Sequence, residues 1–342
     1  IRGEMQSAPC RKSACFCPMR PSFHCCLKRE TLRATLLLDS DAHVTDKFSL
    51  RPRPICAILT KTDREGTRMP ELPEVESVRV ALEASLRGRR VEGVRLPDER
   101  CAAHPAAEAF CDGLRGRAFS ALGRRGKFLY ATLDDGGKLV VHLRMTGRLL
   151  LAEAGGASAA HTRAAFLLDD GRELRFVDAR RFGRLWLLRP GEEDTYTGMA
   201  GLGPEPDDPA LNAAYLRGVC GKSRRAVKAC LLDQSVVAGI GNIYSDEILH
   251  AARIRPDRPA CALSAEEWER LAEAIPRVMR FFTEKNLVTF EEYRQSAGLE
   301  YRNTPWLRVY AHAGKACDIC GTALERRVIG GRGSVFCPRC QV

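Results

Sequence analysis

Two pairs of cysteines near the C-terminus constrain the fold of this chain more than any other feature. Each pair has the form Cys-x2-Cys and sixteen residues separate the pairs; the four residues are Cys317, Cys320, Cys337 and Cys340. This is the spacing of a tetrahedral zinc site on two knuckles. About thirty residues cannot bury enough apolar surface to fold without a metal or another staple. Two disulfides or a redox Cys-x-x-Cys are the alternatives, and two pairs at this separation favour a zinc ribbon that holds one structural Zn²⁺.

The segment between the two cysteine pairs is basic and contains glycines. Arg326, Arg327 and Arg332 flank Gly330-Gly331, which predicts a hairpin with the glycines at its turn. Cations on a ribbon that is held in shape by a metal suit contact with phosphate. The ribbon alone leaves the alternative of a solvated turn open.

The overall charge agrees with a nucleic-acid partner. The 342 residues suggest two or three domains, and 54 Lys plus Arg against 43 Asp plus Glu give a formal charge of +11. Residues 1–68 contain 13 basic and 7 acidic residues, which leaves 41 basic and 36 acidic residues for 69–342. Because the net charge of 69–342 is small, any attraction to nucleic acid must come from local clusters of basic residues. No run of about eighteen apolar residues is present, so we expect no membrane span.

The cysteine count bears on the compartment. Fifteen cysteines would suit a secreted scaffold in a short chain. Here four are assigned to zinc and the others follow no disulfide framework, so we expect a reducing compartment, the bacterial cytoplasm with its nucleoid.

Residues 1–68 differ from everything that follows. They contain six cysteines and a mixed Arg/Pro/Ser composition, with no sustained hydrophobic period of 2 or 3.6 residues. We expect disorder in this leader. It has neither the apolar region of a signal peptide nor a clean amphipathic helix, so we interpret it as a translated upstream frame or a wrongly placed start, and Met69 as the start of the folded protein.

A helix is predicted directly after Met69. Prolines stand early, and three acidic residues occupy the first turns, near the positive end of the helix dipole. Val78, Leu82 and Leu86 then recur at fourfold spacing, as on the buried face of a helix.

The sequence Met-Pro-Glu-Leu-Pro-Glu-Val-Glu at 69–76 resembles the start of bacterial formamidopyrimidine-DNA glycosylases, and a zinc ribbon closes the chains of that family. The resemblance continues through five internal motifs: Arg124-Arg125-Gly126-Lys127, His142-Leu143-Arg144-Met145-Thr146-Gly147, Asp178-Ala179-Arg180-Arg181-Phe182-Gly183, Gly203-Pro204-Glu205-Pro206 and Gly239-Ile240-Gly241-Asn242-Ile243-Tyr244. It covers Met69 to the C-terminus and none of the leader.

This resemblance implies an α+β multidomain fold. We expect an N-terminal catalytic β-sandwich domain with a flanking helix at 69–198, a helix-two-turn-helix DNA-binding domain at 199–308 and a zinc-ribbon finger at 309–342. Apolar alternation over 138–151 and 173–188 agrees with the sandwich. In the second domain, helices are expected at 223–232, 242–252 and 264–284, the last opened by a Ser264-x-x-Glu267 capping box.

The chemistry that the resemblance implies begins at Pro70. If Met69 is removed, Pro70 presents a secondary amine with a pKa of about 8, which is partly neutral and nucleophilic at physiological pH. Attack on the anomeric carbon of a deoxyribose would expel the base and leave an iminium cation, which permits elimination of the strand phosphates. Glu71 matches the general acid/base of the family. Without the motif, Glu71 would be read as a helix-capping acid.

Two cations complete the implied catalytic set. Lys127 follows Gly126 in a predicted turn and matches the family's β-turn lysine, which contacts sugar and phosphate at the damaged nucleotide; a lone lysine there would normally face solvent. Arg332 matches the zinc-ribbon arginine that grips phosphate beside the flipped nucleotide, a task for which a planar guanidinium fork is well shaped.

Removal of a base requires that the nucleotide leave the stack, and the resulting hole costs a few kcal/mol unless something fills it. The resemblance implies that Met145, Arg180 and Phe182 fill it, although hydropathy alone would place Met145 and Phe182 in the core. Other residues expected near DNA are His161, Arg181, Arg224 and Lys228, then Asn242 at a helix N-terminus, and Glu247 as a carboxylate near the lesion pocket.

One segment departs from the family pattern and bears on the substrate. Between Thr283 and Val309 the family carries a Gly-rich loop over the extruded base, whereas this chain has residues 285–293 and 301–305 of another composition. Oxidised purines such as 8-oxoguanine and formamidopyrimidines are the expected lesions, because Leu72-Pro73-Glu74 resembles that branch of the family. The alternative is an endonuclease VIII-like glycosylase that acts on oxidised pyrimidines.

The expected protein is therefore a base-excision-repair DNA glycosylase with AP lyase activity and β,δ-elimination, a monomer that acts on damaged double-stranded DNA. A non-catalytic alternative follows from the leader: if it is retained, the Pro70 nitrogen is an amide and cannot form an iminium, which would leave a damage-binding protein. A zinc-ribbon transcription or structural protein is the third interpretation, and it predicts no effect of Pro70→Gly on DNA cleavage.

Overall fold

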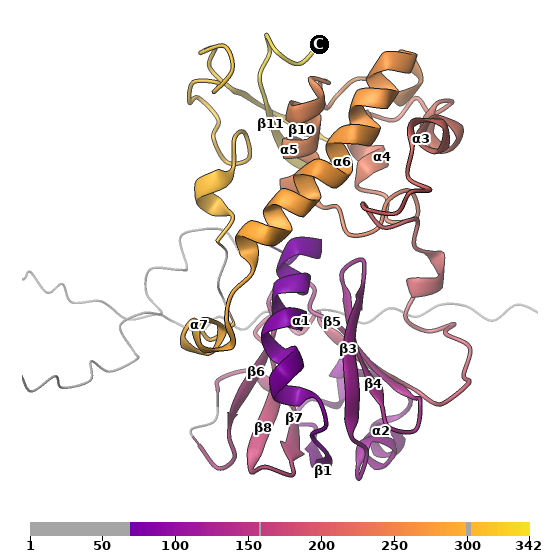
Figure 1. Ribbon diagram of the computed structural model, residues 1–342, viewed down its shortest axis with the longest axis vertical. Helices are drawn as coiled ribbons and strands as arrows, with labels where there is room; N and C mark the ends of the chain where they lie inside the picture. Colours follow the sequence, from indigo (N-terminus) through magenta and orange to yellow (C-terminus); the bar gives the residue numbers. More distant parts are fainter. Residues whose placement is uncertain (1–68, 157–158, 299–301) are drawn as a thin grey trace, which may run out of the picture. The chain divides into compact units, whose positions relative to one another are not determined.

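The computed structural model describes residues 69–156, 159–298 and 302–342 (Figure 1). The leader expected at 1–68 lies outside the described residues, and so do residues 299–301 of the segment that departs from the family pattern. In the described ranges, no helix is both long enough and apolar enough to span a membrane.

Helix α1, Leu72–Leu86, opens the described chain where the sequence predicts a helix. Its first turn is closed by Glu74, whose carboxylate accepts the backbone N–H of Glu71 at 2.9 Å. The side chains that recur at fourfold spacing, Val78, Leu82 and Leu86, are all buried. The prediction of a helix here, with these three residues buried, is confirmed.

The residues after α1 form two β-sheets. The first has strand order β1-β7-β8-β6 and is antiparallel, with β1 at Val91–Arg95, β6 at Gly147–Glu153, β7 at Thr162–Leu168 and β8 at Arg172–Asp178. The second has order β2-β9-β5-β4-β3, with β2 at Ala102–His104, β3 at Phe119–Arg125, β4 at Phe128–Leu133, β5 at Lys138–His142 and β9 at Arg184–Leu188. In this sheet β2 and β9 run parallel and the other neighbours antiparallel. Two short helices, η3 at Glu99–Cys101 and α2 at Ala107–Leu114, lie between the early strands.

Side chains from both sheets and from α1 share one core. Phe166 and Phe176 come from the first sheet, Phe119 and Leu139 from the second and Leu82 from α1, and none is more than 2% exposed. The architecture is therefore a β-sandwich with a flanking helix, as expected. The two stretches of apolar alternation correspond to β5 with β6 and to β8 with β9.

The middle of the chain is helical. Its elements are η4 at Met199–Gly201, α3 at Ala213–Cys220, α4 at Val227–Leu231, α5 at Asn242–Ala252, η5 at Ala260–Ala262, α6 at Ala265–Asn286, α7 at Phe290–Gln295 and η6 at Thr304–Trp306. Tyr244, Trp268 and Leu271 lie in its core, and Leu72 from the start of α1 joins them. Because the rest of α1 packs in the sandwich, this helix connects the two cores.

Two local predictions for the helical part can be compared with the structure. The capping box of α6 is confirmed: the Ser264 hydroxyl accepts the N–H of Glu267, and the Glu267 carboxylate accepts the N–H of Ser264 at 2.8 Å. The helix expected at 223–232 is shorter, because its first residues pair their backbone with the segment before α6. There the N–H of Ala260 donates to the carbonyl of Arg225 at 2.9 Å.

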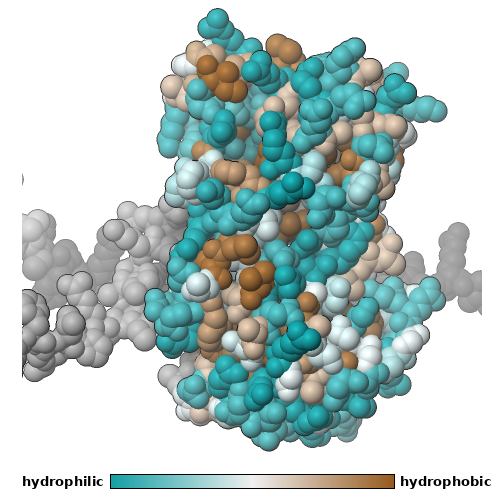
Figure 2. Space-filling view, in the orientation of Figure 1, coloured by the Kyte–Doolittle hydropathy of each residue, from teal (hydrophilic) through white to brown (hydrophobic). Residues whose placement is uncertain are grey.

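The C-terminal residues form the predicted hairpin, β10 at Glu325–Ile329 and β11 at Arg332–Phe336. Gly330 and Gly331 form its turn with φ of 55° and 75°, which glycine adopts without steric cost. The face on which α1 and α6 lie is mostly hydrophilic, and its hydrophobic residues form small separate groups, one of them beside the C-terminal end of α6 (Figure 2).

Candidate active site

The Glu71 carboxylate lies at the N-terminus of α5. Its oxygens accept the backbone N–H groups of Gly241 at 2.7 Å and Ile243 at 2.9 Å, and that of Tyr244 at 3.4 Å. A helix leaves the N–H groups of its first turn unpaired, and its dipole adds partial positive charge there. Burial raises the pKa of Glu71, while nearby Lys127 and the three N–H groups lower it. Burial thus favours the protonated form of Glu71, whereas Lys127 and the N–H groups favour the ionised form.

Two glycines of the Gly-Ile-Gly turn make this contact possible. A Cβ on Gly241 would lie 2.3 Å from the carboxyl carbon of Glu71, and one on Gly239 would lie 2.6 Å from the side chain of Leu72. The N–H of Leu72 also donates to the carbonyl of Gly239 at 3.1 Å. The turn can approach the start of α1 this closely only because these two positions have no side chain.

Lys127 stands in the turn between β3 and β4, and Glu205 fixes that turn. The Glu205 carboxylate accepts the N–H of Gly126 at 2.6 Å and the guanidinium groups of Arg124 at 2.7 Å and Arg125 at 3.0 Å. Lys127 is only 7% exposed, in contrast to the solvent-facing lysine that its turn position alone predicts. The arginine motif and the Gly-Pro-Glu-Pro motif therefore serve together to place one lysine.

Glu71 and Arg332 both lie within electrostatic reach of Lys127. Burial lowers the pKa of Lys127; attraction by Glu71 and Glu74 raises it, and repulsion by Arg332 lowers it further. Arg332 itself is exposed at the start of β11. Residues from α1, from a turn of the sandwich and from the C-terminal hairpin thus meet at one place.

Asn242 and Lys228 hold the hairpin that carries Arg332. Both donate to the carbonyl of Gly333, at 3.2 Å and 3.4 Å. Lys228 is fully buried and pairs with Asp246 at 2.6 Å, and the other oxygen of Asp246 accepts the N–H of Val335 at 3.0 Å. Lys228 is thus buried and positions the hairpin, and its expected place near the DNA stays a prediction.

Glu247 also has a structural position. Its buried carboxylate accepts the backbone N–H groups of Arg308, Val309 and Tyr310 at 2.8–3.2 Å. These contacts fix the start of the segment that leads to the cysteines. Glu247 thus supports the ribbon, and its role beside the lesion stays a prediction.

Three buried side chains beside the site form a polar triangle that sequence patterns did not predict. The Glu74 carboxylate accepts the Tyr244 hydroxyl at 2.5 Å and the Asn303 amide at 2.6 Å, and the same amide lies 2.6 Å from the Tyr244 oxygen. Burial, followed by repulsion from Glu71, raises the pKa of Glu74 to about 7. Glu74 and Pro70 line one small cavity, so a carboxyl group of raised pKa lies beside the expected nucleophile.

Asp178 shapes the loop that carries two expected wedge residues. Its fully buried carboxylate accepts the Thr146 hydroxyl and the N–H groups of Arg180 at 3.2 Å and Gly183 at 2.7 Å. Phe182 is 49% exposed, although hydropathy places it in a core. The Arg180 guanidinium lies 4.9 Å from the centre of its ring. An exposed aromatic ring on a loop that hydrogen bonds to a buried carboxylate hold in place is suited to insertion between bases.

The remaining expected DNA contacts lie at or near the surface. Met145 is partly buried, and His161, Arg181 and Arg224 are exposed. His161 and Arg181 have φ of 68° and 60°, which non-glycine residues rarely adopt and which often marks functional loops. Arg181 also pairs with Asp98 at 3.3 Å, a contact that phosphate would have to replace.

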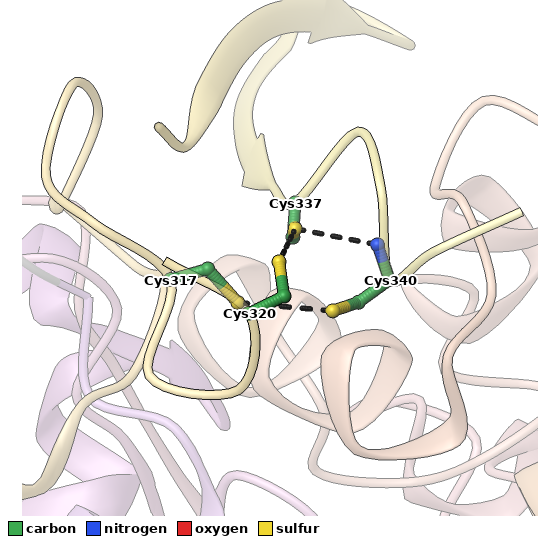
Figure 3. A group of neighbouring side chains, drawn as sticks. All are labelled: Cys317, Cys320, Cys337 and Cys340. Carbon is green, nitrogen blue, oxygen red and sulfur yellow. Dashed lines mark hydrogen bonds between the residues drawn. The ribbon is translucent and has the colours of Figure 1, made fainter. Parts of the chain in front are cut away.

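The four predicted metal ligands converge (Figure 3). All four Sγ atoms lie within 4.8 Å of one another, with 3.5 Å between Cys320 and Cys337 and 4.0 Å between Cys317 and Cys340. Zinc bound tetrahedrally by thiolates, with bonds of about 2.3 Å, needs sulfur atoms about 3.8 Å apart. The donor set and its spacing fit a structural zinc, and Zn²⁺ there would hold the two knuckles together.

Comparisons with known proteins match three parts of the chain to family models. These are the formamidopyrimidine-DNA glycosylase N-terminal domain over residues 69–185, the formamidopyrimidine-DNA glycosylase H2TH domain over 202–291, and a zinc finger found in FPG and IleRS over 314–342. The resemblance inferred from the motifs is confirmed by these matches.

Curated relatives and solved structures agree. A formamidopyrimidine-DNA glycosylase of Moorella thermoacetica is 46% identical over 258 residues, which cover 75% of this chain and 94% of the relative. One of Symbiobacterium thermophilum is 42% identical over 80% of this chain and 89% of its own length. The fold is similar to Lactococcus lactis Fpg in complex with DNA that contains an abasic site, with a TM-score of 0.73, 30% identity and coverage of 79% and 99% of the two chains.

The buried pair that positions the hairpin leads to a stability prediction. Lys228→Met should leave the Asp246 carboxylate buried without its cation and lower the free energy of unfolding by about 3 kcal/mol or more. The double variant Lys228→Met/Asp246→Asn removes the charge and keeps an acceptor for Val335, so it should recover much of the loss. Urea unfolding followed by circular dichroism measures both. Lys222→Met, at an exposed position, is the matched control. An equally small effect at positions 222 and 228 would contradict the prediction.

The pKa of Glu74 leads to a second prediction. Between the ordinary carboxyl value of 4.5 and about 7, the folded state retains a proton that the unfolded state has lost. The free energy of unfolding should therefore fall as pH rises through this window, by up to about 3 kcal/mol. Glu74→Gln cannot titrate and should remove that part of the slope.

Urea unfolding of the full chain at about pH 5 and about pH 7.5 measures the slope. Glu273→Gln changes an exposed carboxylate of α6 and should leave the slope at the wild-type value. If the free energy of unfolding has the same pH dependence in Glu74→Gln and Glu273→Gln, the pKa of Glu74 is not raised in the folded protein and the prediction is wrong.

The cysteine cluster leads to a third prediction. Cys337→Ser should reduce the zinc content of the purified protein by about one equivalent per chain and lower its melting temperature, because a ribbon this small depends on its metal. Cys261→Ser, at an exposed cysteine outside the cluster, should change neither quantity. Elemental analysis by mass spectrometry reports zinc and iron together, so a wild-type protein that contains iron would overturn the assignment.

Proposed function

The chain belongs to the formamidopyrimidine-DNA glycosylase family, and we propose that it is a bifunctional base-excision-repair enzyme. In this proposal it removes oxidised purines such as 8-oxoguanine and formamidopyrimidines from duplex DNA and then cleaves the strand at the abasic site by β,δ-elimination. It acts as a monomer with one structural Zn²⁺, in the cytoplasm where chromosomal DNA lies.

The observation that carries the proposal is that buried Glu71 and Lys127 lie within electrostatic reach of each other, with the buried Pro70 next to Glu71 in the chain and Arg332 within reach of Lys127. A lone buried carboxylate or lysine would be a structural group in most proteins. Here an acid, a lysine of lowered pKa and a potential amine occur together, and an exposed arginine suited to bind phosphate is close to the lysine. Such a combination is typical of a catalytic site.

The proposed reaction begins at Pro70. Its free secondary amine attacks C1′ of the extruded nucleotide, the bond from C1′ to the base breaks, and the base leaves with that electron pair and takes up a proton. Glu71 is placed to supply or accept protons at the sugar because it lies next in the chain and its pKa is raised by burial. The nitrogen of the adduct then loses its proton, and its lone pair forms a C1′=N⁺ double bond as the C1′–O4′ bond breaks. The ring oxygen leaves with that electron pair and takes up a proton, so the adduct becomes a ring-opened iminium ion.

The iminium acts as an electron sink for strand cleavage. Loss of a C2′ proton to a base in the site breaks the bond to the 3′ phosphate, and a second elimination releases the 5′ phosphate. Lys127 and Arg332 are the proposed partners of the flanking phosphates, since both are cations and Arg332 is exposed. Met145, Arg180 and Phe182 are proposed to fill the space that the extruded nucleotide leaves.

The proposed substrate preference follows the family and the damaged DNA in solved complexes of a similar protein. Lactococcus lactis Fpg, to which this fold is similar, has been solved with DNA that contains FAPY-dG and with DNA that contains an oxidized pyrimidine. Formamidopyrimidines and 8-oxoguanine are our first choice for this chain, and oxidised pyrimidines the second. The second choice is kept because Asn303, within the divergent segment, contacts Glu74 beside the cavity that Pro70 lines.

Borohydride trapping tests the proposal. Protein initiated at Met69 and processed to Pro70 should form a covalent adduct with duplex DNA that contains 8-oxoguanine, and mass mapping should place the adduct on Pro70. The 342-residue form should give none, because its Pro70 nitrogen is an amide without a nucleophilic lone pair.

The other outcomes separate the alternatives. Trapping only on an oxidised pyrimidine or on an abasic site would keep the chemistry and change the preferred lesion. Equal trapping by both forms would identify a nucleophile other than Pro70. Binding of damaged DNA without any trapping would leave a non-catalytic damage-binding protein.

A further inference from the structure

A second concave site lies on the helical part, outside the site described above. It is a cavity of about 340 Å³ between α5, α6, η6 and the first cysteine knuckle. Its walls include the apolar side chains of Ala251, Val278 and Phe282. At its edge, Phe281, Trp306 and Ile319 are 38%, 47% and 47% exposed, an unusual concentration of large exposed hydrophobic groups.

Three arginines line the same cavity: Arg253, Arg277 and Arg308. Arg308 pairs with Asp318 at 2.9 Å. The Glu247 carboxylate, also in the lining, is buried and engaged by backbone N–H groups. The cavity therefore has an apolar interior and a cationic rim.

The Lys285 ammonium adds to this charge and also covers the aromatic groups. It lies 4.4 Å from the centre of the Trp306 ring and 5.6 Å from that of Phe281, and the two rings meet edge to face at 6.0 Å. A nucleobase needs an open aromatic face on which to stack. Because Lys285 already lies over a face of Trp306, the arrangement favours an aliphatic or aromatic side chain that enters beside the rings.

The cavity lies on a different side of α5 from the candidate active site. Asn242 and Asp246 face the hairpin that carries Arg332, whereas Glu247 and His250 face this cavity and the segment that leads to the cysteines. A ligand here would therefore reach neither Pro70 nor Glu71 directly. The site is suited to recruitment of a partner.

We propose that this cavity binds an acidic peptide segment of a partner protein, with one aromatic or aliphatic side chain in the apolar interior and flanking carboxylates on the arginines. Charge complementarity identifies the occupant: carboxylates match guanidinium groups in geometry, and the rim carries more cations than free anions. The apolar interior supplies the contact that distinguishes this peptide from a simple polyanion.

Trp306 allows occupancy to be measured directly. The chain has three tryptophans, and the other two, Trp186 and Trp268, are 6% and 3% exposed, so iodide quenching and any shift on binding report mainly on Trp306. The probe is a synthetic peptide of four aspartates followed by a C-terminal phenylalanine, with a fluorescein label at its N-terminus. Binding to the full-length protein should protect Trp306 from iodide and raise the anisotropy of the label.

Variants locate the binding. Arg277→Glu should weaken it about tenfold, because a rim contact becomes a repulsion. Phe281→Ala should also weaken it, by loss of the apolar wall. Arg217→Glu is the matched control, since it makes the same charge change at an exposed position of α3 and should leave binding unchanged. Circular dichroism of each variant establishes that it is folded.

Each remaining result would overturn the proposal. Equal binding of a peptide with asparagines in place of the aspartates would indicate nonspecific apolar contact. Binding that Arg277→Glu and Arg217→Glu reduce equally would indicate general charge attraction. A single-stranded oligonucleotide that competes for the cavity and loses affinity in Arg277→Glu would identify the site as one for nucleic acid. No protection of Trp306 would show that the cavity takes no such peptide.

Discussion

The contact between the Glu71 carboxylate and the first turn of α5 is the interaction on which the rest of the site depends. It joins residues that are 170 to 173 positions apart and brings a helix of the sandwich against a helix of the second core. Hydrogen bonds to an ionised group contribute about 1.5–3 kcal/mol each, more than an ordinary pair. The same contact satisfies N–H groups that α5 would otherwise leave buried and unpaired. The start of α5, the glycine turn before it and Glu71 therefore depend on one another. A side chain at Gly241 would clash with the Glu71 carboxyl group and prevent the contact.

Besides this contact, other buried or partly buried carboxylates fix the remaining elements of the site. Glu205 holds the turn of Lys127, Asp178 holds the loop of Phe182, and Lys228 with Asp246 holds the hairpin of Arg332. Each carboxylate accepts at least one backbone N–H, so each orients a stretch of main chain and not only another side chain. Buried polar groups are costly when a partner is missing. They therefore specify one arrangement of the main chain strongly, and the candidate site residues on these turns are held in place.

The features that the sequence predicts are those set by local spacing. The cysteine pairs, the α6 capping box and the glycine hairpin each depend on residues close together in the chain, and each is present. Hydropathy wrongly predicted that Phe182 is buried in the core. Its loop is held by hydrogen bonds to Asp178, so the loop does not need the ring to be buried, and the ring is exposed. The turn position of Lys127 likewise predicted a solvent-facing side chain, whereas Lys127 is buried. The triangle of Glu74, Tyr244 and Asn303 joins three distant segments, and no local pattern encodes such a contact.

The electrostatics of the buried groups bear on the state of Pro70. Glu71 and Glu74 are both buried, and Lys127 is the buried cation that acts on them. Two carboxylates and one ammonium would leave an excess negative charge if both acids were ionised; burial, and for Glu74 also repulsion from Glu71, raises the pKa of both acids. A free amine at Pro70 would supply a second cation in the same cavity, which would balance the two carboxylates and draw their pKa values down. An uncharged amide there leaves the imbalance in place. Under the proposed mechanism a free amine at Pro70 therefore balances the buried acids, and Glu74, which lines the same small cavity as Pro70, is the carboxylate beside it that would receive the proton the amine loses before it attacks.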